Sequence, residues 1–254
     1  MMGAGTKMLE QIYPLLVVAV GFGVLGITGF GSALISVPLL AWVWPLHQVV
    51  PLVLLIDFVA CLLLGGLQWQ WVQVSMLWRF AGCIVGGVAV GAGLSQVPGV
   101  LDSGGLLIAL GIYVAWVGWR GLRGSISRPG SWLSRPVAAG GLSGIIEVLW
   151  GTSGPLIVSH LATQHDDVRV LKAHTSLCLM LISGLACLTM GVSGRMSSPE
   201  VWGWLPGLMG VALVAMLLGH RWSQRAPVGQ LRRIILMLLV ASGLALAAQG
   251  LRRL

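Results

Sequence analysis

Charged side chains are scarce in this chain: Asp, Glu, Lys and Arg make up only 9% of its 254 residues, whereas 57% are hydrophobic. That composition excludes an ordinary soluble globular protein, which needs far more polar surface. Alternating polar and apolar strands of about ten residues, the signature of an outer-membrane barrel, are also lacking. Continuous apolar runs such as 49–67 and 234–248 are present instead and are typical of membrane helices. We therefore expect an all-α polytopic membrane protein in a lipid bilayer.

Other absences limit the chemistry. The four cysteines lie inside apolar segments without CxxC spacing, so they are interpreted as packing residues, and neither a metal nor a cofactor is expected. No Gly-x-x-x-x-Gly-Lys loop occurs, so this chain alone is not expected to use ATP. The net charge of +8 lies in short loops that orient helices and predicts no nucleic-acid partner. No removable signal peptide is expected, because the apolar region after Lys7 continues to Trp44.

Two apolar segments are too long to be single membrane helices. As helices, 11–44 and 135–162 would span about 51 Å and about 42 Å, against a hydrocarbon thickness of about 30 Å. Glycine-rich stretches lie inside them, Gly26-Ile27-Thr28-Gly29-Phe30-Gly31-Ser32 and Gly151-Thr152-Ser153-Gly154-Pro155. We expect helix breaks there, and paired breaks in two halves of a chain point to a transporter's binding site. Ordinary helices are expected near 47–67, 72–95, 101–120, 170–192, 200–220 and 231–250.

The order of these segments indicates a duplicated unit. A shift of 122 residues aligns identical residues, among them Gly29 with Gly151 and Leu34 with Leu156. Each half reads as one broken segment followed by three ordinary helices. The expected division is a first transmembrane repeat at 1–122, a basic linker at 123–134 and a second repeat at 135–254.

The basic residues favour re-entrant hairpins over spanning helices at the two breaks. If both long segments dip into the membrane and return, only four of the fifteen basic residues, Lys7, Arg195, Arg252 and Arg253, lie opposite the rest. Three crossings plus one hairpin per repeat is an odd number, which inverts the second repeat relative to the first. The basic 120–135 and 221–233 loops are then cytoplasmic in a multi-pass inner-membrane protein. Eight spanning helices are the alternative.

The sequence resembles the TauE/SafE family of sulfite and organosulfonate exporters over nearly its whole length. The resemblance rests on Gly23-x-x-Gly26-x-x-Gly29-x-Gly31 with Val37-Pro38-Leu39-Leu40, on Gly82/Gly86/Gly87/Gly91, on Lys172-Ala173-His174-Thr175-Ser176-Leu177, and on Gly210…Gly219-His220-Arg221…Leu231-Arg232-Arg233. It implies a duplicated, secondary-active transporter of small sulfur-containing or carboxylate anions. The chain departs from the family's glycine-rich second motif at Glu147-Val148-Leu149-Trp150, which leaves the substrate open.

A small anion needs hydrogen-bond donors and positive potential, and a half-helix N-terminus supplies both. Small residues can also serve close helix packing, and basic ones can only set topology, so those readings stay open. Arg169 and Lys172 could make a basic access path that Thr175 and Ser176 line. The expected substrate-binding residues are Gly29, Gly31, Ser32, Gly151, Thr152, Ser153, Gly154, Lys172, Thr175 and Ser176.

Two acids, Asp57 and Glu147, are expected deep in the membrane. An ionisable group there is costly and is a functional hypothesis by default, so both are candidates for binding a coupling proton. A structural pairing of either acid is the alternative. His160 and His174 are plausible hydrogen-bond partners, but they lack the paired spacing of metal ligands.

Two other function classes stay open at this point. Gly151-Thr152-Ser153-Gly154 is a Gly-x-Ser-Gly pattern like that of rhomboid intramembrane proteases, with His174 as a conceivable base. A duplicated layout has no evident use in such an enzyme, so no enzyme activity is expected. A non-transporting membrane scaffold is the third class, and the oligomeric state is open, with a homodimer among the possibilities.

Overall fold

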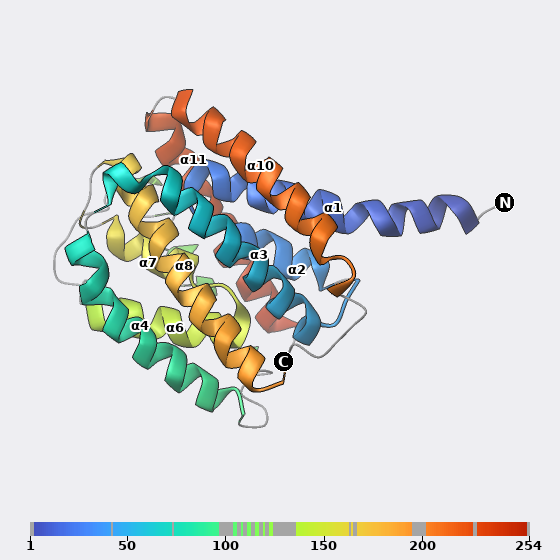
Figure 1. The fold of residues 1–254 in the computed structure, drawn as a ribbon, viewed down its shortest axis with the longest axis horizontal. Coiled ribbons are helices and arrows are strands. Elements are labelled where there is room, and N and C mark those ends of the chain that lie inside the picture. The colour runs from blue at the N-terminus through green and yellow to red at the C-terminus, as the bar shows by residue number, and fades with distance from the viewer. Residues whose placement is uncertain are drawn as a thin grey trace.

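The computed structural model describes residues 3–41, 43–72, 74–96, 136–162, 164, 167–194, 202–225 and 228–252, with scattered positions between 104 and 123. These residues form helices and connecting turns (Figure 1). The long helices are α1 Gly3–Thr28, α3 Leu46–Leu67, α4 Val74–Leu94, α6 Pro136–Trp150, α8 Val168–Val192, α10 Leu205–Arg225 and α11 Val228–Leu251. Two short helices, α2 Ser32–Leu40 and α7 Gly154–Leu161, lie directly after the predicted breaks, and a 3-10 turn, η1, covers Trp69–Trp71.

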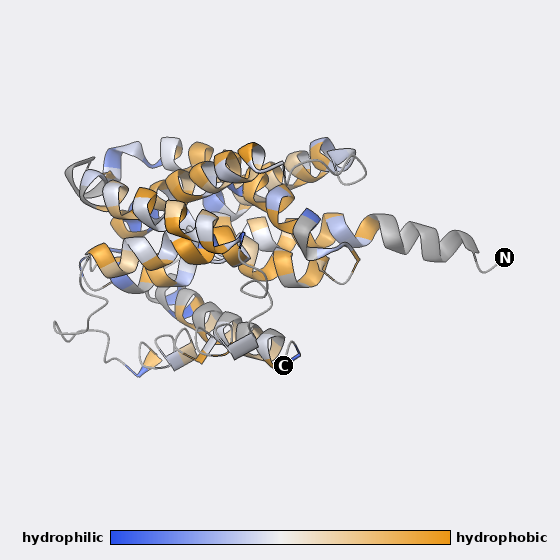
Figure 2. Cartoon of the chain, turned by 90° about the horizontal axis from the view of Figure 1, so that it is seen from below, coloured by the Kyte–Doolittle hydropathy of each residue, from blue (hydrophilic) through white to orange (hydrophobic). Residues whose placement is uncertain are grey.

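Three of the described helices are long and apolar enough to cross a membrane: Gln48–Leu67, Val168–Val192 and Leu205–Arg225. Shorter apolar helices cover Ile12–Thr28, Phe80–Leu94 and Val137–Trp150. Hydrophobic residues predominate along the drawn helices (Figure 2). Large apolar side chains such as Leu16, Val192 and Trp78 are exposed, as expected for a surface that lipid covers. The described residues are therefore helical, and their apolar helices are consistent with the expected membrane protein.

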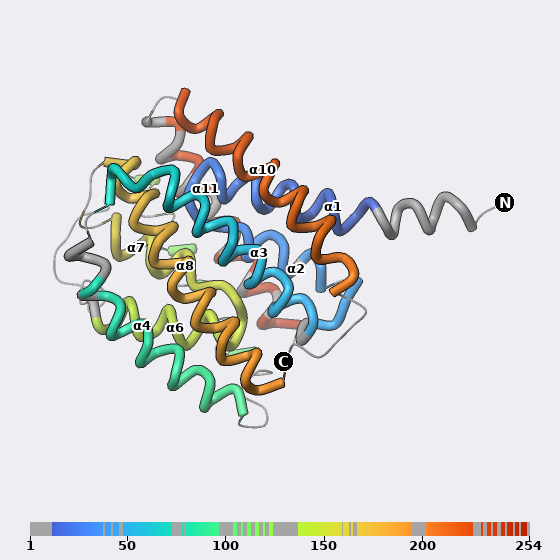
Figure 3. The backbone as a smooth tube through the Cα atoms, viewed as in Figure 1, coloured from blue at the N-terminus to red at the C-terminus, as the bar shows by residue number. Residues whose placement is uncertain are grey.

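The first break turns the chain back on itself. Gly29 and Gly31 both have positive φ angles, 86° and 97°, which end α1 and redirect the backbone into α2. The Tyr13 hydroxyl donates to the Leu39 carbonyl at 3.0 Å, so the middle of α1 lies beside the end of α2. Helices α1 and α2 therefore form an antiparallel hairpin, hairpin one (Figure 3).

The second break makes a second helical hairpin. Gly151 has a φ angle of 68°, and Pro155 follows in the first turn of α7, where its missing N–H costs nothing. Gly140 near the start of α6 and His160 near the end of α7 both contact Phe80 of α4, with the Phe80 and His160 rings 4.9 Å apart. The end of α7 therefore lies near the start of α6, and the two helices form an antiparallel hairpin, hairpin two.

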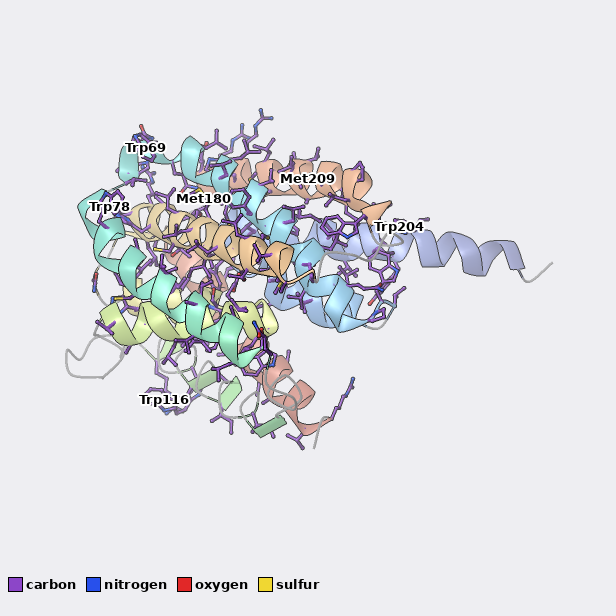
Figure 4. The ribbon with its side chains drawn as sticks, turned by 60° about the horizontal axis from the view of Figure 1, so that its bottom comes forward. Trp69, Trp78, Trp116, Met180, Trp204 and Met209 are labelled. Atoms are coloured by element: carbon purple, nitrogen blue, oxygen red, sulfur yellow. The ribbon has the colours of Figure 1, made fainter. Side chains whose placement is uncertain are left out.

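The two hairpins open at opposite ends of the bundle. Trp44, just before α3, packs against Trp204 before α10, with ring centroids 5.7 Å apart. Trp71, after α3, lies 5.7 Å from the Arg169 guanidinium at the start of α8. Since α2 returns to the Trp44 end and α7 returns to the Arg169 end, the hairpins enter from opposite sides. Trp69 and Trp78 lie at one end in Figure 4, and Trp204 lies at the other.

Helices α3 and α8 cross at the centre of the structure. Gly65 lies against Leu177 and Phe58 against Gly184, so the two helices run antiparallel. Helix α1 packs on α10, and α4 packs on α6, so each flank joins one helix from each half of the chain (Figure 1). Close backbone approach at glycines holds both flanks, as small residues do in membrane bundles.

Helix α11 lies beside the stretch predicted as the helix at 101–120, much of which is outside the described residues. The described positions of this stretch that precede residue 120 are helical. Gly111 and Gly243 each lie against the backbone of the other segment, again with little side-chain volume between them. The basic linker predicted at 123–134 lies outside the described residues, apart from Arg123.

Candidate functional site

The tips of the two hairpins meet inside the bundle. Phe30, at the tip of hairpin one, is fully buried, and Gly154 packs against it so closely that an added Cβ would lie 3.4 Å from the Phe30 ring. The Thr28 hydroxyl, 2.7 Å from the Phe30 carbonyl oxygen, helps to hold that tip in its turn. The structure thus brings together both glycine-rich stretches predicted as site residues, which lie more than a hundred residues apart in the sequence.

Asp57 of α3 is held by hairpin one. Its carboxyl is buried, with 2% of the residue exposed, and the hydroxyl of Ser32, the first residue of α2, donates to Oδ1. The second oxygen, Oδ2, is 3.8 Å from the Cys61 thiol one helical turn away. Asp57 is therefore joined directly to the first residue of α2 by a hydrogen bond.

Glu147 of α6 occupies the corresponding place at hairpin two. The residue is 2% exposed, and its Oε2 accepts a hydrogen bond of 2.8 Å from the backbone N–H of Ser153. That N–H stands just before α7, where the first amides of a helix have no partner within it. The carboxyl thus closes the turn between α6 and α7.

A single serine joins the two acids. Ser183 of α8 is fully buried, and its hydroxyl oxygen lies 3.1 Å from Glu147 Oε1 and 3.4 Å from Asp57 Oδ2. A continuous polar chain therefore runs from Ser32 at one tip, through Asp57, Ser183 and Glu147, to Ser153 at the other. It crosses the centre of the bundle between α3 and α8.

Hairpin two also holds buried donors that have no partner among the described residues. The indole Nε1 of Trp150 and the hydroxyl of Thr152 flank Gly151 and are both enclosed. A buried polar group without a hydrogen bond costs about 1–3 kcal/mol. Two such donors beside the N-terminus of α7 make a site that an anion could satisfy.

Lys172 lies at the tip of hairpin one rather than on an exposed access path. Only 5% of the residue is exposed, and Nζ donates to the Gly26 carbonyl and, at 2.8 Å, to Ser223 Oγ. His220 Nδ1 is 3.3 Å from the same nitrogen. Lys172 therefore ties α8 to α1 and α10, beside Gly29.

The hydroxyls expected near Lys172 are turned to their own helix. Thr175 Oγ1 donates to the Leu171 carbonyl at 2.8 Å, and Ser176 Oγ donates to the Lys172 carbonyl at 2.9 Å. Both residues are fully buried. Such back-bonding occupies their hydroxyl hydrogens, so in this state they offer acceptors rather than donors to a ligand.

The remaining predicted polar residues have local roles. Asp167 caps α8 by accepting the Arg169 N–H at 2.8 Å, and the Arg169 side chain lies over Trp71. His160 bonds to Gln164 at 2.8 Å, and His174 Nδ1 lies 2.8 Å from the Val170 carbonyl. No described hydrogen bond joins the Ser153 hydroxyl to an imidazole, so the protease pattern gains no dyad from this geometry.

Sequence reasoning missed three residues of this region. From the sequence, Ser183 is not singled out, Cys61 is interpreted with the other cysteines as packing, and Trp150 is named only as part of the departure from the family motif. One signal was available: the 122-residue shift aligns Cys61 with Ser183, so equivalent positions of the two halves both contact Asp57 Oδ2. Nothing in the sequence marked His220 and Ser223 as partners of Lys172.

Known proteins were compared with the chain as a whole. No solved structure matches it significantly. A protein of Comamonas testosteroni, named "Probable inner membrane transporter protein TsaS", is 33% identical over 201 residues, which cover 77% of this chain and 81% of that protein. The sequence model of the sulfite exporter TauE/SafE family matches residues 13–246. The chain therefore belongs to the TauE/SafE sulfite exporter family.

Proposed function

We propose that the chain is a secondary-active inner-membrane exporter of small sulfur-containing or carboxylate anions, such as sulfite or organosulfonates, and not an enzyme. The observation that carries the proposal is the meeting of two broken-helix tips beside buried donors without partners. Membership of the TauE/SafE family also supports a transporter, and the relative's printed name is that of an inner membrane transporter. Irregular backbone at membrane depth is the usual place of a transporter's site.

The proposed architecture is a pair of inverted repeats, at 1–122 and 135–254, with the basic linker 123–134 between them. Adding 122 to the end of α1 and to the starts of α2 and α3 gives the end of α6 and the starts of α7 and α8. Equivalent helices α3 and α8 run antiparallel, and the hairpins enter from opposite ends. Both features support inversion, because a parallel repeat would keep the same direction.

The substrate anion would lie at the tip of hairpin two. Thr152 Oγ1, Trp150 Nε1 and the free N–H of Gly154 at the start of α7 are donors without a fixed charge, which suits an anion that must also leave. Gly29, Gly31 and Ser32 would complete the site from hairpin one, and Lys172 would add positive potential behind that tip. Thr175 and Ser176 would enter the site only if α8 changed its internal hydrogen bonds.

The coupling ion would be a proton on Asp57 or Glu147. A carboxylate beside the anion site would repel the substrate, so proton binding and anion binding would favour each other. The basic 120–135 and 221–233 loops would face the cytoplasm, which gives the larger charge asymmetry across the membrane. In this proposal the transported proton and the substrate anion would both bind at the buried cluster of Asp57, Glu147 and the hairpin tips.

Flux in proteoliposomes tests the function. Sulfite, thiosulfate, sulfoacetate, taurine-like sulfonates and simple carboxylates would be compared with and without a pH gradient. We expect at least one anion class to be carried with saturation and to respond to the gradient. A chain that binds none of them, and gains no thermal stability from any, would instead be a scaffold.

A second arm tests the coupling alone. Glu147→Gln imitates the neutral acid, so it should keep substrate binding and lose much of the gradient response. Full gradient dependence in this variant would show that the acid is structural and would leave Asp57 as the next candidate. A Ser153→Ala variant that abolished cleavage of a membrane substrate would support the protease alternative, whereas a transporter would show only weaker anion binding.

A further inference from the structure

We infer that Asp57 and Glu147 act as one acid, with a single proton that Ser183 passes between them, so that the position of this proton links hairpin one to hairpin two. This inference deepens the proposed function by defining its coupling site. Its test needs no substrate, so either can fail without the other.

The inference begins with the number of hydrogens on Ser183. Its oxygen lies within hydrogen-bond distance of both Glu147 Oε1 and Asp57 Oδ2, at 3.1 Å and 3.4 Å. A hydroxyl carries one hydrogen and can donate it to one acceptor. For both contacts to be hydrogen bonds, the other hydrogen must belong to a carboxyl group. The geometry therefore holds one proton on the pair of acids.

The outer oxygens of the two acids are already fixed as acceptors. Asp57 Oδ1 accepts from the Ser32 hydroxyl, and Glu147 Oε2 accepts from the Ser153 N–H at 2.8 Å. The shared proton is thus confined to the inner oxygens, which both face Ser183. Each acid is bound at its outer oxygen to the tip of a different hairpin.

The transfer step balances with no further reactant. With the proton on Asp57 Oδ2, that O–H donates to Ser183 Oγ while the Ser183 O–H donates to Glu147 Oε1. A concerted shift breaks the Asp57 O–H and forms a new O–H on Ser183, while the old Ser183 O–H breaks and forms an O–H on Glu147. One proton moves from α3 to α6, no electrons are exchanged, and the serine is unchanged.

Among the residues that the structure describes, few other titratable groups face this pair. Cys61 of α3 contacts Asp57 Oδ2 at 3.8 Å, and Cys187 of α8 is close enough to interact electrostatically with both acids. Lys172, the buried basic residue of α8, precedes Ser183 by eleven residues, or about 16 Å of helix. None of these groups bridges the two carboxyls, so the pair must share its charge internally.

The test is a pH titration of the carboxyl C=O stretch by infrared spectroscopy, on the full chain in lipid nanodiscs without substrate. Glu147→Gln leaves Asp57 alone, and Asp57→Asn leaves Glu147 alone. We expect the wild-type chain to titrate in two steps. The ratio of the proton concentrations at the midpoints of these two steps should be at least ten times the ratio between the midpoints of the two single variants. A wild-type curve equal to the sum of the two single-variant curves would overturn the inference, with no substitution at Ser183 required.

Variants of the bridge sharpen the result. Ser183→Ala should reduce the separation of the two steps at least fivefold, and Ser183→Thr, which keeps the hydroxyl, should restore it. Cys61→Ala is the matched control, since Cys61 is the equivalent residue of the first half and contacts Asp57 but not Glu147 in the described contacts. Equal effects of Ser183→Ala and Cys61→Ala would contradict the bridging role and leave Ser183 as a packing residue.

Discussion

The two hairpin tips have the same backbone design and different chemistry. At the tip of hairpin one, tip one, glycines with positive φ angles are followed by Ser32, whose hydroxyl is bound to Asp57. Beside this tip, the Lys172 Nζ contacts Gly26, Ser223 and His220. At tip two, the Ser153 N–H is bound to Glu147, but the donors of Trp150 and Thr152 have no described partner.

This difference indicates that the two tips have different structural roles. A tip whose polar side chains already have partners offers a ligand fewer free donors, so tip one is better suited to hold helices together and to complete a site than to form its main donors. A tip with enclosed free donors is stabilised when an anion satisfies them.

The largest effect that could break the comparison is topological. If the halves are inverted repeats, reporter fusions at residues 125 and 225 should both report the cytoplasm, and fusions at residue 7 and at the C-terminus should both report the opposite side. The expected signals are all or none. Fusions at 125 and 225 on opposite sides would reject the inverted arrangement in favour of eight spanning helices.

The next effect concerns the free donors of tip two. Thr152→Val removes one hydrogen-bond donor with little change of shape, whereas Trp150→Phe removes the indole donor together with one ring of a buried side chain. A hydrogen bond to a charged partner contributes about 1.5–3 kcal/mol, so each variant should raise the KM for the transported anion about tenfold or more. Ser143→Ala is the control, because Ser143 is also buried without a described partner but lies two turns earlier on α6. Equal KM values for all three variants would place the substrate elsewhere.

The sequence predicted the backbone features of the site well. Glycine with positive φ and proline in a first helical turn are local signals, so both breaks could be placed within a few residues. The inverted order of the halves, which rests on counting crossings and basic residues, stays a prediction. These predictions depend on short stretches of sequence and on the thickness of a bilayer.

Side-chain partners could not be predicted in the same way. Ser183 meets Asp57 across 126 residues, and Lys172 meets Gly26 across 146, so their contacts depend on how helices from the two halves cross. Helical spacing placed Lys172, Thr175 and Ser176 together, but it could not show that all three are buried or that Lys172 bonds to α1 and α10. A polar residue in an apolar helix signals a buried partner without naming it.

A smaller effect separates the buried cation of tip one from an exposed one. Lys172→Ala leaves the Gly26 carbonyl and Ser223 without a donor, which should cost about 1–3 kcal/mol of stability and weaken anion uptake. Arg123→Ala removes a guanidinium that lies over Trp119 at 4.0 Å and should change either quantity much less. Because Lys172 is buried, high salt should not reduce the difference between these variants. Thermal unfolding and flux at two salt concentrations measure it, and equal effects would refute a special role for Lys172.

The smallest effect compares the glycines that turn the two tips. Gly151→Ala forces a side chain into the left-handed region, where a Cβ costs about 1–2 kcal/mol, and its nearest described neighbour is Val50 Cγ1 at 3.4 Å. Gly194, with a φ angle of 70° and open space around it, measures that backbone cost alone. Gly29→Ala should cost more than either, because its Cβ would lie 2.7 Å from Lys172 Cγ and 3.1 Å from the Lys172 carbonyl oxygen. Thermal unfolding in one detergent ranks the three variants. A Gly29 variant as stable as the Gly194 variant would show that tip one can move away from α8. Tip one would then not hold these helices together.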